Sequence, residues 1–217
     1  MEQVTVDSTP QTSRPGRPRD KALASHVFNV ALQIYGETGW SGFHLSKVSA
    51  LGGIGKSSLY SRWGDRDVLL KAAFSNLITC PGPVGNSARE ILIHEADFRL
   101  RLYLGKYRTA IRRLFVEATQ ANEPILREIF DDVFVNPVNV ISTRLWDFKA
   151  SGELHEFTSV VRLLDAIEGS VLMRTFCLPE DFIECFLGKV PAYVEDLVDD
   201  QLGLPHPSRQ AECIRDA

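Results

Sequence analysis

The chain has 217 residues, 44% of them hydrophobic, and a formal net charge of −4 at pH 7, which suits one large domain or two small ones around a buried core. It contains no apolar run long enough to span a bilayer and does not open with a basic region followed by an apolar stretch, so we expect no membrane span, no secretory signal and a cytoplasmic protein. Its four cysteines form no Cys-x-x-Cys pair, so we expect no metal site and no disulfide framework but mostly buried thiols, with a redox pair of Cys177 and Cys185 as the alternative.

Residues 1–18 form a polar segment that we expect to be a disordered basic arm. The segment contains three prolines and runs into Arg14-Pro-Gly-Arg-Pro-Arg19. Prolines hold a chain extended, and arginines on an extended chain suit a narrow, electronegative minor groove. Arg17 and Arg19 are therefore candidate DNA contacts, and a solvated basic tail is the alternative.

Four helices are predicted next, over residues 20–38, 44–51, 55–62 and 66–79, because apolar residues recur there at spacings of three and four. Gly52-Gly53 makes the corner between the second and the third, since glycine adopts positive φ at little steric cost. Asp65 is a suitable N-cap for the fourth. A short polar, cationic helix after a tight turn is typical of a major-groove reader, so we predict a helix-turn-helix DNA-binding domain over residues 19–79.

The remaining sequence predicts a larger helical domain over residues 84–204 and a tail over 205–217. Amphipathic stretches predict helices over 87–104, 106–121, 124–150, 158–177 and 179–202. Asn136-Pro137 should interrupt or kink the third of these, and the pairs Arg112-Arg113 and Asp131-Asp132 are interpreted as solvated faces. No stretch alternates strictly between apolar and polar residues, so the predicted fold class is all-α.

The charges are split between these two parts. Residues 1–71 hold nine Lys and Arg against six Asp and Glu, whereas residues 72–217 hold fifteen against twenty-two. A cationic N-terminal part on an acidic body favours an anionic partner for the N-terminal part.

A rival interpretation of the glycine corner is the P-loop of an NTPase. Gly55, Lys56 and Ser57 fit the second half of the pattern G-x-x-x-x-G-K-[ST], but the first glycine would fall on Ala50. A P-loop also follows a buried strand, whereas residues 45–50 read as a polar-interleaved helix. No catalytic set of side chains stands out by spacing, so we expect neither an enzyme nor a cofactor.

An ungapped series of positions between Val27 and Leu70 carries a family pattern. The positions are Ala31, Tyr35, Gly39-Trp40, Gly53-Ile54, Lys56, Leu59-Tyr60, Trp63 and Asp65-Arg66-Asp67. This pattern resembles the tetracycline-repressor (TetR) family of bacterial transcriptional regulators, whose recognition helix reads Ser-Lys-Gly-Thr-Leu-Tyr. The departures from the family pattern are His44, Ser49, Gly52, Gly55, Ser57, Ser58 and Arg62.

The resemblance makes helix 55–62 the recognition helix. The DNA-binding candidates are Arg17, Arg19, His44, Gly55, Lys56, Ser57, Ser58, Tyr60, Arg62 and Arg66. Lys56 lies at the helix N-terminus, where its charge and the helix dipole both favour a phosphate. Ser57 can donate to a phosphate or a base edge, or it can cap the helix. Tyr60 matches the family's phosphate-contacting tyrosine, and the arginines are candidate phosphate clamps.

The resemblance also implies that residues 72–217 bind a small-molecule effector and form a homodimer, in which the last two long helices of each subunit build a four-helix bundle. The apolar positions available for this are Val160, Val161, Leu164, Ile167, Val171, Leu172, Phe182, Phe186, Val190, Tyr193, Val194 and Leu197, with Gly169 allowing close approach. The alternative is that these residues fill the monomer core. No effector-binding residue is assigned, although a pocket, or plain core, could be built from Phe98, Tyr103, Tyr107, Phe115, Phe130, Phe134, Trp146, Phe148 and Phe176.

The sequence therefore predicts a ligand-responsive, sequence-specific DNA-binding transcriptional regulator, a repressor that a small-molecule effector releases from a palindromic operator on double-stranded DNA. Two alternatives stay open, a helical protein-interaction module without DNA binding and the P-loop NTPase.

Overall fold

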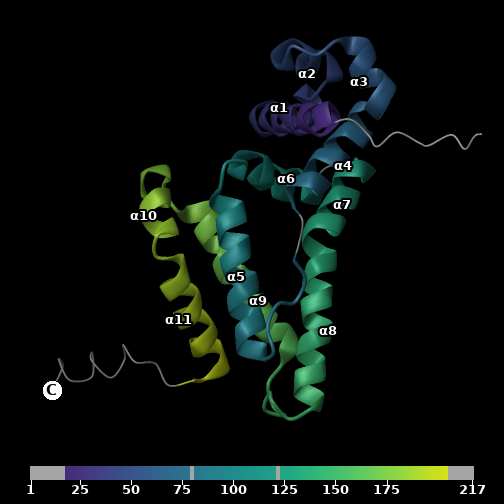
Figure 1. Cartoon of the computed structure of the whole chain (residues 1–217). Helices are drawn as coiled ribbons and strands as arrows, with labels where there is room; N and C mark the ends of the chain where they lie inside the picture. The colour runs from purple at the N-terminus through teal and green to yellow at the C-terminus, as the bar shows by residue number, and fades with distance from the viewer. Residues whose placement is uncertain (1–17, 79–80, 121–122, 205–217) are drawn as a thin grey trace, which may run out of the picture.

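The computed structural model describes residues 18–78, 81–120 and 123–204, with side chains from residue 21 onward. Helices and short connections make up these ranges, without a β-strand among them, which confirms the predicted all-α class. Figure 1 shows two stacked parts: α1, α2 and α3 form a small upper group, and α4 joins it to the longer helices below.

The N-terminal part consists of α1 (Pro18–Gly42), α2 (Leu45–Gly52), α3 (Lys56–Trp63) and α4 (Arg66–Leu77). The regular geometry of α1 is interrupted at Gly39, with φ 68 and ψ −177, next to the predicted end of the first helix. Asp65 caps α4 as predicted, because its carboxylate accepts the N–H of Val68 at 2.9 Å.

The C-terminal part consists of α5 (Ala88–Leu104), α6 (Arg108–Gln120), α7 (Pro124–Phe130), the π turn η1 (Asp131–Val135), α8 (Asn136–Ala150), α9 (Val160–Cys177), the 3-10 turn η2 (Glu180–Phe182), α10 (Ile183–Leu187) and α11 (Val190–Leu202). The hydroxyls of Ser87 and Ser159 cap α5 and α9. Helix α5 is central, and α6, α8, α9 and α11 all pack against it.

Helices α7 and α8 form one continuous rod through η1 (Figure 1). The Asn136 N–H donates to the carbonyl of Asp131, five residues earlier, which is the π pattern. Pro137 follows directly; it has no N–H to donate, and its ring would clash with a carbonyl one turn back in an α-helix. The wider turn accommodates the proline without breaking the rod, so the predicted interruption takes the form of a π turn.

The single helix predicted over residues 179–202 is wrong, because the chain breaks at Gly188-Lys189 between α10 and α11. Pro191 lies in the first turn of α11, where its missing N–H is tolerated, whereas a continuous helix would clash with its ring. The expected burial of thiols is also wrong for Cys177 and Cys185, which are free and exposed on either side of η2. The other two cysteines lie outside the described residues.

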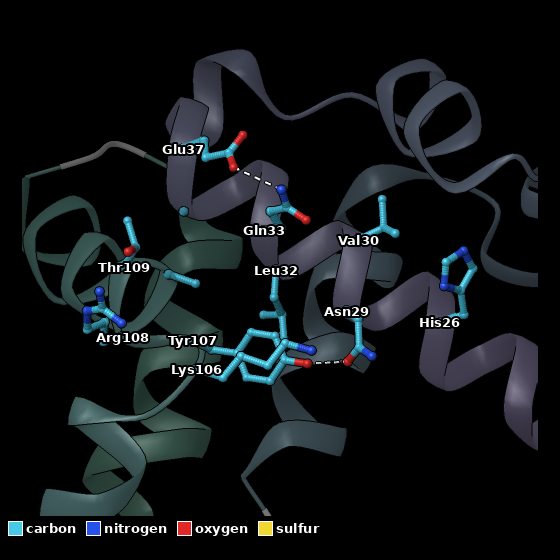
Figure 2. A pocket seen from close by; sticks show the side chains of 12 residues that line it. His26, Asn29, Val30, Leu32, Gln33, Glu37, Lys106, Tyr107, Arg108 and Thr109 are labelled. Atoms are coloured by element: carbon cyan, nitrogen blue, oxygen red, sulfur yellow. Dashed lines mark hydrogen bonds between the residues drawn. The ribbon is translucent and has the colours of Figure 1, made fainter. Parts of the chain in front are cut away.

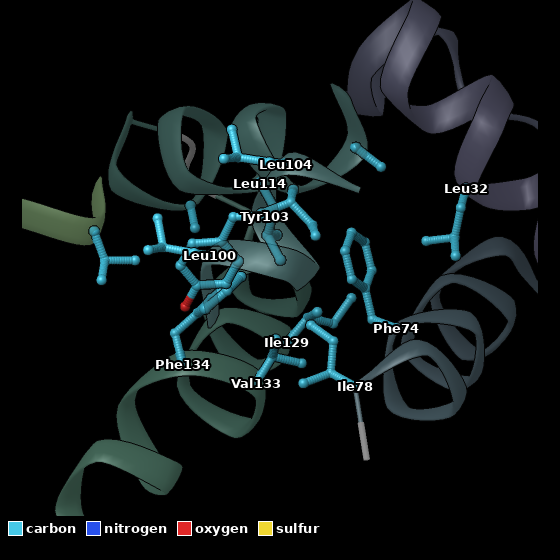
Figure 3. Packing of buried hydrophobic residues seen from close by; sticks show 14 of the residues in the cluster. Leu32, Phe74, Ile78, Leu100, Tyr103, Leu104, Leu114, Ile129, Val133 and Phe134 are labelled. Carbon is cyan, nitrogen blue, oxygen red and sulfur yellow. The ribbon is translucent and has the colours of Figure 1, made fainter. Parts of the chain in front are cut away.

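The buried core is continuous between the two parts. Helix α1 packs along α6, and α4 packs on both α1 and α7. Figure 3 shows Phe74 of α4 and Ile78, the residue after α4, in the same apolar cluster as Leu114, Ile129 and Val133 of the lower part. Because a packed interior resists small displacements, movement of α6 or α7 is transmitted to α1 and α4.

Candidate nucleic-acid interface and the cavities behind it

The corner between α2 and α3 is held by its own backbone and by Ser49. Gly53 ends α2 in the left-handed region, with φ 62 and ψ 31, and the Ile54 N–H donates to the carbonyl of Ser49 at 3.0 Å. The buried Ser49 hydroxyl donates to the carbonyl of Ile54 at 2.6 Å. The serine that stands where the family pattern has alanine is therefore fully bonded inside the corner, and it helps to fix the direction in which α3 leaves.

Helix α3 is anchored on one face and exposed on the other. Leu59 is completely buried, and the Trp63 ring packs edge-on against Phe28 of α1 with centroids 5.8 Å apart. On the outer face Lys56, Ser57, Tyr60 and Arg62 are exposed, and Ser58 is half-buried. The structure thus brings five of the predicted site residues onto one short, rigidly seated helix.

The N-terminus of α3 is open. Gly55 precedes the helix without a side-chain cap, and a methyl group added to Gly55 would have no atom within 4 Å. The first N–H groups of a helix carry its positive dipole end. Together with the exposed Lys56, they make a site suited to an oxyanion such as a phosphate.

Cationic and titratable residues outside α3 extend this surface. His44 is exposed at the position before α2. Lys47, three residues further on and also exposed, is absent from the predicted set, although its helical spacing from His44 could have indicated it. The predictions for Arg17 and for the side chain of Arg19 lie outside the described residues.

Arg66 has an intramolecular role. Its Nη1 donates to the carbonyl of Trp40 at 3.2 Å and to the carbonyl of Phe43 at 3.3 Å, and its guanidinium lies 4.0 Å from the centroid of the Trp40 ring. The side chain therefore pins the turn between α1 and α2 to the start of α4. Its role as a phosphate clamp stays a prediction. In the DNA-free chain its guanidinium is already bonded to these two carbonyls.

The end of α1 is clamped by two charged residues of α6. Glu117 accepts the N–H of Trp40 at 3.0 Å, and Arg113 Nε donates to the carbonyl of Gly36 at 2.9 Å. The two side chains also pair with each other at 3.6 Å. Arg113, interpreted from the sequence as part of a solvated face, is half-buried and bonds to α1 as well.

A second link joins α4 to the rod. Lys71 Nζ lies 2.5 Å from Glu128 Oε1 and 3.0 Å from Asp132 Oδ2. Asp132 of the π turn is exposed, in agreement with its interpretation as part of a solvated face, and it also pairs with Lys71. Such half-exposed pairs contribute little to stability, but they connect α4, the last helix of the N-terminal part, to the π turn η1, which also contains Phe134.

A polar cavity of about 520 Å³ lies at the joint between α1 and the start of α6 (Figure 2). Figure 2 shows Tyr107 donating a hydrogen bond to Asn29 across it, and Gln33 bonding to Glu37 on the α1 side. Tyr107, one of the aromatic residues considered for an effector pocket, thus belongs to the contact between the two parts.

A different cavity, of about 250 Å³, lies within the C-terminal part between α5, α6, the α7–α8 rod and α9. Of the nine aromatic residues considered in the sequence, Tyr103, Phe115, Phe130 and Phe134 line it. The others lie elsewhere, because helical spacing alone does not say which faces meet.

The sequence analysis missed the buried charges at this cavity: Arg99 and Glu168 line it, whereas Glu95 pairs with Arg99 but lines a different cavity. Arg99 is 3% exposed and Glu95, one turn earlier on α5, is also 3% exposed, and Glu168 of α9 reaches the same guanidinium. Burial raises the pKa of the Glu168 carboxyl to about 7. The positive charge of Arg99 lowers this pKa, but by less than burial raises it. The available signal was the position of Glu95 and Arg99 within the apolar face of α5, where charged residues are rare.

The P-loop interpretation of the corner is not supported by the geometry. Residues Leu45–Gly52, which precede the glycines, form a helix rather than a strand, so the strand that positions a P-loop is missing at this place. Across the described ranges, no three or more His, Cys, Asp or Glu side chains are grouped so that they could hold a metal ion. No helix in the described part of the chain is long and apolar enough to cross a membrane.

The sequence matches no protein-family model and no curated protein. The structure is similar to that of FadR from Bacillus subtilis in complex with stearoyl-CoA, with 16% identity, a TM-score of 0.60, and 83% of this chain and 98% of that chain covered. It is also similar to a TetR-family transcriptional regulator from Rhodococcus sp., with 17% identity, a TM-score of 0.58 and coverage of 83% and 99%.

A third similar structure is GusR from Salmonella enterica, with 12% identity, a TM-score of 0.61, and 84% of this chain and 96% of that chain covered. In all three cases the similarity extends over nearly the whole length of the solved chain. It establishes that this chain has the all-α fold of these regulators, with the helix-turn-helix at its N-terminal end.

Proposed function

We propose that the chain is a homodimeric, sequence-specific DNA-binding transcriptional regulator, a repressor that a small-molecule effector releases from its operator. The observation that carries this proposal is the seating of α3, in which Leu59 is buried and Lys56, Ser57 and Tyr60 project outward. The fold shared with regulators that bind DNA supports it. The protein would act where the DNA is, in the cytoplasm.

In this proposal α3 enters the major groove. Lys56 and the open helix N-terminus at Gly55 hold a phosphate, while the hydroxyls of Ser57, Ser58 and Tyr60 reach phosphates or base edges. Arg62 and His44 extend the phosphate contacts on either side, and Arg17 and Arg19 enter the adjacent minor groove from the arm.

The dimer would form through the outer faces of α9 and the region of α10 and α11. Several apolar side chains there are exposed: Val161 at 57%, Met173 at 62%, Phe176 at 45% and Phe182 at 59%. Gly169 on the same outer side of α9 has no atom near an added Cβ, so another helix can approach it closely. A second copy of the chain would cover this surface and place two α3 helices on a palindromic site.

Other positions considered for the dimer instead fill the monomer core. Val160, Ile167, Val171, Val190 and Val194 are each at most 1% exposed. The two roles proposed for α9 thus fall on different faces of the same helix, and an apolar substitution test of dimerisation should use the exposed set.

Effector release would proceed as a shift between two populations. A ligand in the C-terminal part would be bound more tightly by one arrangement of α6 and the α7–α8 rod than by another. It would then favour the spacing of the two α3 helices of the dimer that belongs to this arrangement. Glu117 of α6, which bonds to α1, and Lys71 of α4, which pairs with the rod, are direct polar links along which such a shift reaches α3. The stearoyl-CoA complex of the Bacillus subtilis regulator supports small-molecule binding as a property of this fold.

A gel-shift titration against the DNA upstream of the chain's own gene and its neighbours tests the proposal. We expect salt-steep binding to one palindromic segment, with little binding to a scrambled segment of equal composition. The double variant Lys56→Ala with Tyr60→Ala should lose this binding and keep its dimeric state. Equal affinity for both DNA segments, or an unchanged affinity of the double variant, would instead favour a helical interaction module.

A further inference from the structure

The cavity inside the C-terminal part has walls of aromatic rings. Phe115 and Phe134 lie 4.3 Å apart by centroid, and Phe130 and Tyr103 close the group at 5.3 Å and 5.5 Å from Phe134. Figure 3 shows Tyr103 and Phe134 side by side. Such ring faces carry negative potential, so they favour a flat apolar ligand and, in particular, a cation.

One side of the cavity carries more negative than positive charge. Arg99 Nε lies 2.5 Å from Glu95 Oε1 and 3.2 Å from Glu168 Oε1, and its Nη1 donates to the Tyr103 hydroxyl at 2.6 Å. Asp165, exposed at the rim, adds a further carboxylate. Two carboxyl groups, of Glu168 and Asp165, therefore line the cavity with one guanidinium, which is also paired with Glu95 outside the lining.

The nearby cation Arg127 does not balance this excess. Its guanidinium lies 5.5 Å from the Phe130 ring, but it pairs with Asp131 at 3.0 Å and does not line the cavity.

The size of the cavity limits the ligand. An engineered apolar cavity of about 150 Å³ takes up benzene, so a cavity of about 250 Å³ holds one or two fused rings with a short substituent. A long acyl chain does not fit in that space, and an anionic head group would meet the excess of carboxylates.

We propose that this cavity binds a compact aromatic amine, with its rings among Tyr103, Phe115, Phe130 and Phe134 and its ammonium group against Glu168 and Asp165. This inference rests on the proposed function for the role of the amine as the effector, whereas the binding itself follows from the cavity. The ammonium group places a positive charge beside the buried carboxyl of Glu168, and its N–H groups donate to the carboxylate oxygens. The rings exclude water from that pair.

Calorimetric titration of the purified, DNA-free protein tests the inference with three probes of equal skeleton: naphthylethylamine, naphthylethanol and naphthylacetate. We expect the amine to bind with a dissociation constant at least about tenfold below that of the alcohol, which corresponds to one charge-assisted contact. The acetate should bind more weakly than the alcohol. Equal binding of the amine and the alcohol, or tighter binding of the acetate, would overturn the proposal.

Two variants locate the site, each with a matched control. Glu168→Gln should weaken amine binding about tenfold and leave alcohol binding unchanged, whereas Glu184→Gln on α10, which is exposed, should change neither.

Asn139→Trp places a large ring at the exposed rim of the cavity and should abolish binding, whereas Thr143→Trp, one turn further along α8, should not. Because Asn139 is exposed, this second pair stays informative if Glu168→Gln unfolds. Unchanged amine binding in Asn139→Trp would place the amine elsewhere and sink the inference.

Release of DNA by naphthylethylamine in the gel shift then separates this inference from the proposed function. Amine binding by a protein that ignores DNA would support the cavity assignment and reject the regulator. DNA binding by a protein that does not bind the amine would reject the cavity assignment alone.

Discussion

The carboxylate of Glu117 accepts the backbone N–H of Trp40 at 3.0 Å, across 77 positions of sequence. One residue of the core helix α6 therefore holds the last turn of α1, the helix on which α3 is seated. Through this contact the orientation of α3 depends on the position of α6.

Glu117→Ala removes that acceptor and leaves a partly buried N–H without a partner. We expect the free energy of unfolding to fall by about 1–3 kcal/mol, the usual range for a hydrogen bond to a charged group. Urea denaturation measures it. Glu37→Ala on the exposed side of α1, where Glu37 accepts a hydrogen bond from Gln33, is the control and should change it by less than about 0.5 kcal/mol. Equal losses in the two variants would mean that the α1–α6 contact is not a stabilising one.

Gly39 and Gly64 form a matched pair for separating backbone strain from a steric clash. Both have positive φ, 68 at Gly39 and 70 at Gly64, but an added Cβ would lie 2.4 Å from Glu117 Oε1 at Gly39 and meet nothing within 4 Å at Gly64. Gly64→Ala should cost about 1–3 kcal/mol from its backbone conformation alone. Gly39→Ala should cost more, because Glu117 must also move, and thermal unfolding of both variants checks the difference. A smaller loss at Gly39 would argue against the clamp.

Lys56→Ala and Arg66→Ala should behave differently. Lys56→Ala is expected to reduce the slope of log affinity for DNA against log salt by about one per subunit, with the unfolding free energy unchanged. Arg66→Ala should instead lower the unfolding free energy by about 1–2 kcal/mol, because it frees two carbonyls and the face of Trp40. Gel shifts at several salt concentrations and urea melts provide both readings. A changed salt slope without lost stability in Arg66→Ala would restore its role as a phosphate clamp.

Glu168 should make stability depend on pH. Burial raises the pKa of its carboxyl from 4.5 to about 7, so the folded state binds this proton more tightly than the unfolded state does. Its contribution is present at low pH and is lost as pH rises through about 7. The charged neighbours on α5 are Glu95 and Arg99, and Arg99 stays cationic throughout this range.

The unfolding free energy of the wild type minus that of Glu168→Gln should therefore fall by about 2–3 kcal/mol between about pH 5 and about pH 8. Urea melts at four pH values measure it, and the same difference taken with Glu184→Gln should be flat. A difference that rises with pH would show that the folded protein favours the ionised carboxylate.

The helices and the corner could be predicted because their signals are local. The αL position of Gly53 and the cap at Asp65 depend on residues within one turn. The prediction of a single helix over residues 179–202 was wrong because the apolar spacing continues through Gly188, while Pro191 prevents the helix from doing so.

The sequence by itself determined the all-α class and the corner between α2 and α3, since hydrogen bonding within a helix and steric limits on φ act over a few positions. Only the tertiary structure decided that Arg66 bonds to the carbonyls of the α1–α2 turn and that Glu117 holds α1. It likewise decided that Arg99 is buried between the carboxyl groups of Glu95 and Glu168. Which charges become buried together depends on which helix faces meet, and that is settled by the packing of the whole chain.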